Sequence, residues 1–94
     1  MVYVYILRSI GWQGQLYIGS TTDLAARLIA HNQGKSPHTA KFRPWELVYH
    51  EHHESQQIAL KREKQIKRWS GKKKLALVSG NLEALKELAR RTVK

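Results

Sequence analysis

The amino-terminal segment contains the pattern that most limits the fold, because it predicts two strands joined by a turn. Residues 2–8 alternate β-branched and aromatic side chains, which is typical of a β-strand. Residues 11–14 read Gly-Trp-Gln-Gly and predict a turn, and residues 16–19 resume the strand pattern. We therefore expect residues 2–20 to form an antiparallel hairpin, around which the rest of the chain must build a sheet.

Helix and turn signals follow the hairpin. Side chains at 21–23 offer N-cap oxygens, so a helix is predicted from about 23 to 33, with Gly34 placed as its C-terminal stop. Residues 35–44 contain two prolines and four basic or imidazole groups, and we expect a loop there. Residues 45–50 predict the third strand.

The remainder of the chain is predicted to be helical. A long helix is expected over residues 54–69 and a short one over 72–78, after an interruption at Ser-Gly. Asn81 is a candidate cap for a final helix that reaches about residue 91. The order β-β-α-β-α-α-α predicts one small α+β domain over residues 1–94, with helices packed on an antiparallel sheet.

The charge of the chain points to its partner. Seventeen Lys and Arg against seven Asp and Glu give a formal charge of +10. An excess of this size predicts a polyanion, and nucleic acid is the usual one. A ribosome-associated or merely soluble basic protein is the alternative that charge leaves open. Charge alone does not distinguish DNA, in single-stranded, duplex or branched form, from RNA.

Composition also excludes some classes of protein. The chain has no cysteine, so a disulfide framework and a thiolate zinc site are ruled out. No apolar run approaches the roughly 20 residues that a membrane span needs, and residues 1–8 do not resemble a secretory leader. The expected location is the cytoplasm.

Two predicted helices carry polar residues on faces that should be buried. Leu24, Arg27, Leu28 and His31 fall on one stripe, and Arg27 and His31 are neighbours at i and i+4. A local explanation is an arginine stem lying along apolar surface and a histidine with a nearby hydrogen-bond partner.

The long helix repeats this pattern at Glu63, which shares a face with Ala59 and Ile66. An inward carboxylate needs an ion pair, with Arg27 or Arg62 as candidates, or a metal ion. Inward polar residues on both helices favour one shared site.

Two further groups of side chains are capable of chemistry. Tyr5 and Tyr17 lie on the two hairpin strands, where either can simply pack. A phenol acts as a base only if cations or a metal lower its pKa from about 10. His50 and His52 point the same way on a strand and are compatible with zinc, but solvated polar residues are the favoured interpretation.

With these residues in view, the chain resembles the GIY-YIG nuclease family, and specifically its short stand-alone bacterial members, from about residue 2 to 80. Tyr3-Val4-Tyr5 matches the first motif, with Tyr3 in place of its glycine, and Tyr17-Ile18-Gly19 matches the second. The segment 23–32 matches the following helix, and 63–69 the helix that bears the metal-binding glutamate. The asparagine that some members use has its nearest candidate in Asn81.

The resemblance implies a three-stranded antiparallel sheet flanked by helices and hydrolysis of DNA phosphodiesters with one divalent ion. It implies Glu63 as metal ligand, Tyr5 or Tyr17 as the group that activates water, and Arg27 as the phosphate contact. His31 occupies an active-site position, and Gly19 permits close packing of the backbone. Mg²⁺ or Mn²⁺ is the expected ion, since one carboxylate plus water molecules suits Mg²⁺.

These expectations describe a metal-dependent endonuclease with little sequence specificity, acting in DNA repair or processing. The rival is a nucleic-acid-binding module with weak or no nuclease activity. Trp45 and Trp69 are expected in the core, although either ring can stack on a base. The cations expected to hold the backbone without reading sequence are Lys35, Lys41, Arg43, Lys64, Lys67, Arg68, Lys72, Lys73 and Lys74.

Overall fold

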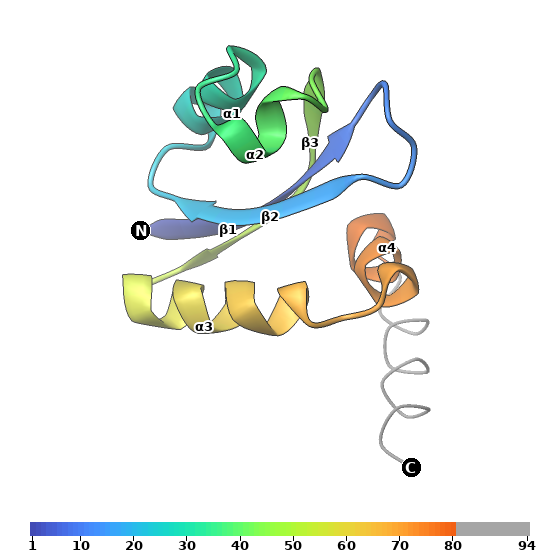
Figure 1. Cartoon of the computed structure of the whole chain (residues 1–94). Helices are drawn as coiled ribbons and strands as arrows, with labels where there is room; N and C mark the ends of the chain where they lie inside the picture. Colours follow the sequence, from blue (N-terminus) through green and yellow to red (C-terminus); the bar gives the residue numbers. More distant parts are fainter. Residues whose placement is uncertain (81–94) are drawn as a thin grey trace.

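The computed structural model describes residues 1–80 and contains one three-stranded antiparallel sheet (Figure 1). Strands β1 (Val2–Ser9) and β2 (Leu16–Thr21) form the predicted hairpin, and β3 (Trp45–His53) pairs with the other edge of β1. The strand order is therefore β2-β1-β3, with the first strand in the middle. The predicted α+β class and three-stranded sheet are confirmed.

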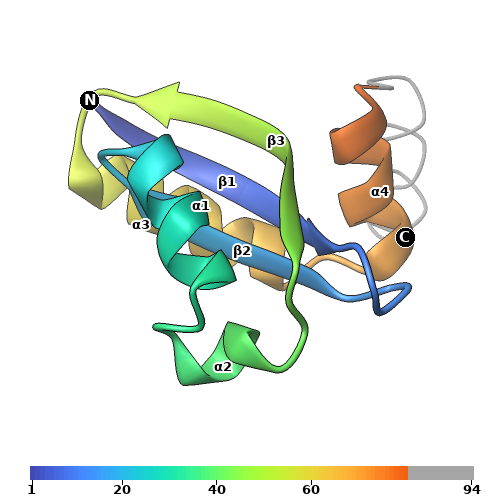
Figure 2. The same ribbon diagram turned by 90° about the horizontal axis from the view of Figure 1, so that it is seen from above.

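Helices cover both faces of the sheet. Helices α1 (Leu24–Asn32) and α2 (Pro37–Ala40) lie on one side, and α3 (Gln56–Lys67) and α4 (Gly71–Ser79) lie on the other (Figure 1). In Figure 2, which looks down on the sheet, α1 lies in front of the strands and α3 lies behind them. The protein thus has three layers, with the sheet between two helical layers.

The alternation of side chains along β1 explains why both faces are apolar. Val4 and Ile6 point to the α3 side, where they pack with Ile66. Tyr5 and Leu7 point to the opposite side. Successive side chains of a strand alternate between faces, and all four of these β1 residues are at most 2 % exposed. The middle strand therefore belongs to both halves of the core.

Capping residues set the helix boundaries. The Asp23 side chain accepts a hydrogen bond of 3.0 Å from the Ala26 amide, which starts α1. Gly34 follows the end of α1 with a φ of 77°, a left-handed conformation that favours glycine. Ser55 caps α3, since its side chain accepts from the Ile58 amide.

Some predicted boundaries were wrong. The segment predicted as a loop contains α2, which begins at Pro37, a residue well suited to the first turn of a helix. The third strand runs to His53 rather than to residue 50, because pairing with β1 continues to Val2. The expected helix to residue 91, together with Asn81, lies outside the described residues. Within residues 1–80, no helix is long and apolar enough to cross a membrane.

Candidate active site

Tyr5 and Gly19 lie opposite each other in the β1–β2 ladder, and their contact is very close. A Cβ atom added to Gly19 would lie 2.6 Å from the Tyr5 hydroxyl oxygen and 2.8 Å from its Cζ. The phenol therefore lies across the backbone of Gly19. The glycine is required here by space, because any side chain would displace the tyrosine.

A chain of buried hydrogen bonds runs from Tyr5 to the α2 segment. The Tyr5 hydroxyl lies 3.0 Å from His31 Nε2, and His31 Nδ1 lies 2.8 Å from Thr39 Oγ1. The Thr39 hydroxyl donates to the Ser36 carbonyl at 3.4 Å, so it accepts from Nδ1–H. Nε2 is then the unprotonated nitrogen, and Tyr5 donates to it. This sets both the histidine tautomer and the direction of the phenol proton.

The pKa shifts agree with this arrangement. Burial raises the pKa of Tyr5, the neighbouring Tyr17 raises it further, and the positive charge of Arg27 opposes both effects without overcoming them. Burial and, to a lesser extent, Arg27 lower the pKa of His31. Tyr5 and His31 are therefore a neutral donor and a neutral acceptor at pH 7. Arg27 does act to lower the Tyr5 pKa, as a nearby cation should, but the larger effect of burial leaves that pKa above its ordinary value.

Tyr17 occupies a different position from Tyr5. Its ring centroid lies 4.9 Å from that of His31 and 6.3 Å from that of Tyr5, so the three rings form one group. Among the described residues its hydroxyl has no hydrogen-bond partner, and no buried side-chain polar atom is left without one. The Tyr17 hydroxyl consequently reaches solvent, unlike that of Tyr5.

Arg27 lies on α1, one turn before His31, and is exposed, so its predicted place on a buried face is wrong, whereas His31 is buried. It lines a surface hollow of about 200 Å³ together with Thr21, Asp23 and Ala26. Its charge acts on the ionisation of both Tyr5 and His31, so the guanidinium lies beside the tyrosine–histidine group. Arg27 thus presents a cation toward solvent at the rim of this group.

Glu63 comes from α3, the helix on the other side of the sheet (Figure 1). Its side chain is 15 % exposed and pairs with Lys67 at 2.7 Å, one turn along the same helix. The suggested ion pairs of Glu63 with Arg27 or Arg62 are wrong, because Glu63 pairs with Lys67. Arg62 instead bonds to Glu51 at 2.9 Å. The negative charge of Glu63 contributes to the raised pKa of Tyr5, which places the carboxylate within electrostatic range of the phenol.

The donor atoms near this site suit a hard divalent ion. Within residues 1–80 no three His, Cys, Asp or Glu side chains are grouped closely enough to hold a metal on their own. A single carboxylate such as Glu63 fits Mg²⁺, which keeps several water ligands, and does not fit a closed zinc site. His50 and His52 are exposed and make edge contacts with Tyr3, at 6.0 and 6.3 Å between ring centroids.

Sequence reasoning missed Thr39. Its side chain is fully buried, its hydroxyl orients His31, and its carbonyl accepts from the Trp45 indole at 2.8 Å. The signal in the sequence was a threonine two residues after a proline, in a segment predicted to be a loop. Trp45 itself is buried in the core as expected, with 4 % exposed.

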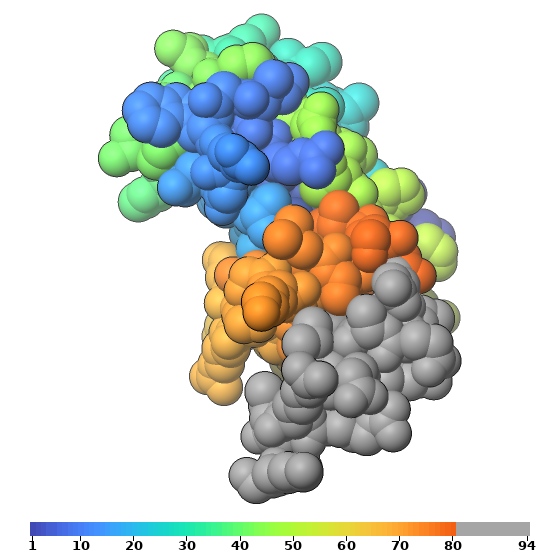
Figure 3. All heavy atoms as spheres, turned by 90° about the vertical axis from the view of Figure 1, so that its right-hand side faces the viewer, coloured from blue at the N-terminus to red at the C-terminus, as the bar shows by residue number. Residues whose placement is uncertain are grey.

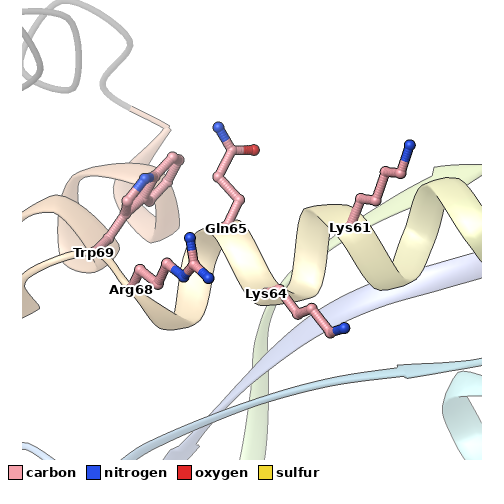
Figure 4. A pocket seen from close by; sticks show the side chains of 5 residues that line it. All are labelled: Lys61, Lys64, Gln65, Arg68 and Trp69. Carbon is pink, nitrogen blue, oxygen red and sulfur yellow. The ribbon is translucent and has the colours of Figure 1, made fainter.

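The predicted backbone-binding cations do not form one surface. Lys35, Lys41 and Arg43 belong to the segment around α2, on the same side of the sheet as Tyr5 and Tyr17. The other predicted cations lie on α3, at its C-cap or on α4, in the opposite layer. Figure 4 shows Lys64 on α3 and Arg68 at its C-cap, with Trp69 nearby. This α3 surface contains a hollow of about 390 Å³. The Trp69 ring is contacted by two cations, the Lys73 Nζ at 4.5 Å and the Arg62 guanidinium at 5.1 Å.

The fold and this group of residues agree with the family that comparison with known proteins identifies. The GIY-YIG catalytic domain matches residues 1–76, and the chain belongs to the GIY-YIG family. This is a superfamily of endonucleases that act on nucleic acid and generally use divalent metal ions. The predicted family membership is confirmed.

The relatives fall into a narrower group. The chain is 42 % identical over 78 residues to a UPF0213 protein of Staphylococcus saprophyticus, covering 82 % of this chain and 93 % of that one. It is 42 % identical over 73 residues to a UPF0213 protein of Bacillus pumilus, covering 77 % and 72 %. The solution NMR structure of a UPF0213 protein from Bacillus halodurans is 36 % identical, with a TM-score of 0.54 and 86 % of each chain covered.

Proposed function

We propose that this protein is an endonuclease that hydrolyses DNA phosphodiester bonds with one divalent ion and little sequence specificity, in DNA repair or processing. The observation that supports it is the meeting of two tyrosines, an arginine and a histidine on one face of the sheet, with a carboxylate from α3 within electrostatic range. These are the groups that phosphodiester hydrolysis requires, and they occur in a GIY-YIG chain.

The geometry suggests separate roles for the two tyrosines. The Tyr17 hydroxyl reaches solvent, so it is the better candidate to accept a proton from, or to orient, the attacking water. The Tyr5 hydroxyl donates a hydrogen bond to His31 and its pKa is raised, so Tyr5 keeps its proton and acts as a positioning residue. Arg27 binds the scissile phosphate and stabilises charge that develops on it.

Glu63 is the residue that would hold Mg²⁺ or Mn²⁺. The ion would supply electrostatic stabilisation of the phosphate and of the leaving oxygen. Glu63 can take this role only when Lys67, which pairs with it at 2.7 Å, moves aside. Lys67 is half exposed, and an exposed i,i+4 pair contributes only about 0.3–0.5 kcal/mol, so the ion pair is a weak barrier.

That ion pair also favours a second candidate, a nucleic-acid-binding module with little or no cleavage. In such a protein Glu63 would serve only to stabilise α3 through Lys67. The two candidates differ in one measurable property, which is divalent-ion-dependent cutting of DNA.

The test is incubation with single-stranded, duplex and branched DNA, in Mg²⁺, in Mn²⁺ and in chelator. We expect cutting only with a metal ion, and Tyr17→Phe and Arg27→Ala should each lower turnover by at least ~10²-fold. Tyr5→Phe should lower turnover to a similar extent. It should also lower thermal stability, because His31 Nε2 loses its buried donor. A Tyr17→Phe variant that cuts normally would show that this ring only packs.

Binding itself should be sequence-independent and strongly dependent on salt. If the protein neutralises about five phosphates, log K should fall against log salt with a slope near −4 to −5 on duplex DNA. Replacing Lys72, Lys73 and Lys74 by Ala should flatten this slope by roughly one to three units. Titration at several salt concentrations measures both values, and an affinity independent of salt would contradict the proposal.

A further inference from the structure

The turn between β1 and β2 holds an exposed tryptophan on a fixed backbone. Trp12 is 56 % exposed, and its amide donates to Ser9 Oγ at 3.1 Å. The Ser9 hydroxyl in turn donates to the Phe42 carbonyl at 2.6 Å, and Ser9 is 4 % exposed. The Ile10 amide bonds to the Pro44 carbonyl at 2.9 Å. The turn is therefore joined to the segment before β3, and the indole has a defined position at the surface.

The surroundings of the indole are aromatic and cationic. The Trp12 and Phe42 ring centroids are 5.7 Å apart with an interplanar angle of 85°, so at least one face of the indole is free. The Lys41 Nζ lies 5.1 Å from the centroid of the Phe42 ring, and Lys41 is itself exposed. An accessible aromatic face beside a lysine is the combination that binds single-stranded nucleic acid, through base stacking and backbone attraction.

Aromatic ring contacts connect this surface to the candidate active site, and they pass through Trp45, which is buried. From Trp12 the ring contacts continue through Phe42 and Trp45 to Tyr17, in steps of 5.7, 6.3 and 6.4 Å. Trp12 therefore lies within about 20 Å of Tyr17, a distance that at most about six nucleotides of one strand span, because about 3.4 Å is the spacing of a fully stacked strand and an unpaired strand extends further. Figure 3 shows the hairpin turn in blue at the surface, next to the green segment that contains α2.

We propose that Trp12 stacks on an unpaired nucleobase of the bound nucleic acid, so that the protein prefers substrates with a single-stranded stretch. The inference rests on the proposed function and specifies its substrate class. In an intact duplex the base faces are covered by their neighbours and are not available to the indole. A duplex is then held mainly by cations such as Lys41, whereas an unpaired strand gains the additional stacking contact.

The test compares single-stranded and duplex oligonucleotides by fluorescence anisotropy, in chelator so that no cleavage occurs. Trp12→Ala should weaken binding to the single strand by about 5- to 150-fold, the range of base–aromatic stacking. Its binding to the duplex should change less than about twofold. Trp12→Phe should retain most of the affinity. DNA and RNA single strands are tested in parallel, and either one showing the loss supports the inference.

The matched control is Ile10→Ala, which removes an apolar side chain that is 61 % exposed on the same turn. It should leave both affinities unchanged. The inference is overturned if Trp12→Ala loses nothing or loses equally on both forms, or if Ile10→Ala causes the same loss. It is also overturned if the wild type self-associates in sedimentation and Trp12→Ala abolishes that, since the turn is then a protein contact. Failure of the wild type to bind either oligonucleotide would instead reject the proposed function.

Discussion

Glu63→Gln is expected to abolish cleavage that depends on Mg²⁺ or Mn²⁺ while the protein stays folded and continues to bind DNA. The amide keeps the shape of the side chain but removes the charge that a divalent ion needs. Loss of several kcal/mol of transition-state stabilisation corresponds to a fall of at least ~10³-fold in turnover. Cleavage rates over a range of metal concentrations, together with circular dichroism, provide the measurement.

Glu54→Gln is the matched control, because Glu54 is exposed just before α3 and the substitution raises the net charge by the same amount. We expect it to cut like the wild type. If Glu63→Gln cuts as fast as Glu54→Gln, the carboxylate has no catalytic role. The nucleic-acid-binding candidate then becomes the better description of the protein.

Gly19→Ala should have the second large effect, on both stability and turnover. The new methyl group would lie 2.6 Å from the Tyr5 hydroxyl oxygen, and Tyr5 has little room to move, since it is 2 % exposed and bonded to His31. Forcing a methyl group into a packed core costs about 1–3 kcal/mol, or roughly 5–20 °C in melting temperature. Displacing Tyr5 should lower turnover by ~10²-fold, as for other small misplacements in active sites.

Gly11→Ala is the corresponding control, because no atom lies within 4 Å of a Cβ placed at Gly11. Its melting temperature and turnover should match the wild type within error. Equal melting temperatures for Gly19→Ala and Gly11→Ala would mean that the phenol moves aside freely. The hydrogen bond from Tyr5 to His31 would then not be a rigid part of the site.

Much of the fold could be predicted from the sequence, because the relevant signals are local. The alternation of residues 2–8, the cap at residues 21–23 and the stop at Gly34 each depend on a few neighbouring residues, and the structure contains all three features. Helix α2 was missed because it has only four residues and follows a proline that also suits a loop. The length of β3 was underestimated because its last residues are held by pairing with the start of β1, which is a long-range effect.

The candidate site was less predictable. Helical periodicity alone brought Arg27 and His31 onto one stripe of α1, but only His31 is buried there and Arg27 is exposed. The partners of His31 could not be deduced, because Tyr5 and Thr39 reach it from β1 and α2 through tertiary packing. The raised pKa of Tyr5 was missed for the same reason, since desolvation depends on which atoms surround the phenol in the folded protein.

The middle position of β1 has a consequence for the order in which the protein assembles. Tyr5 meets Gly19 through a short hairpin, whereas β1 meets β3 only after the intervening segment has been folded back. Contacts between residues close in sequence form faster than those that must close a long loop. Glu63 comes still later along the chain, on α3. In a nascent chain, Tyr5 and Tyr17 would therefore come together before Glu63 joins them. The proposed cleavage activity would then be the last property that the chain acquires.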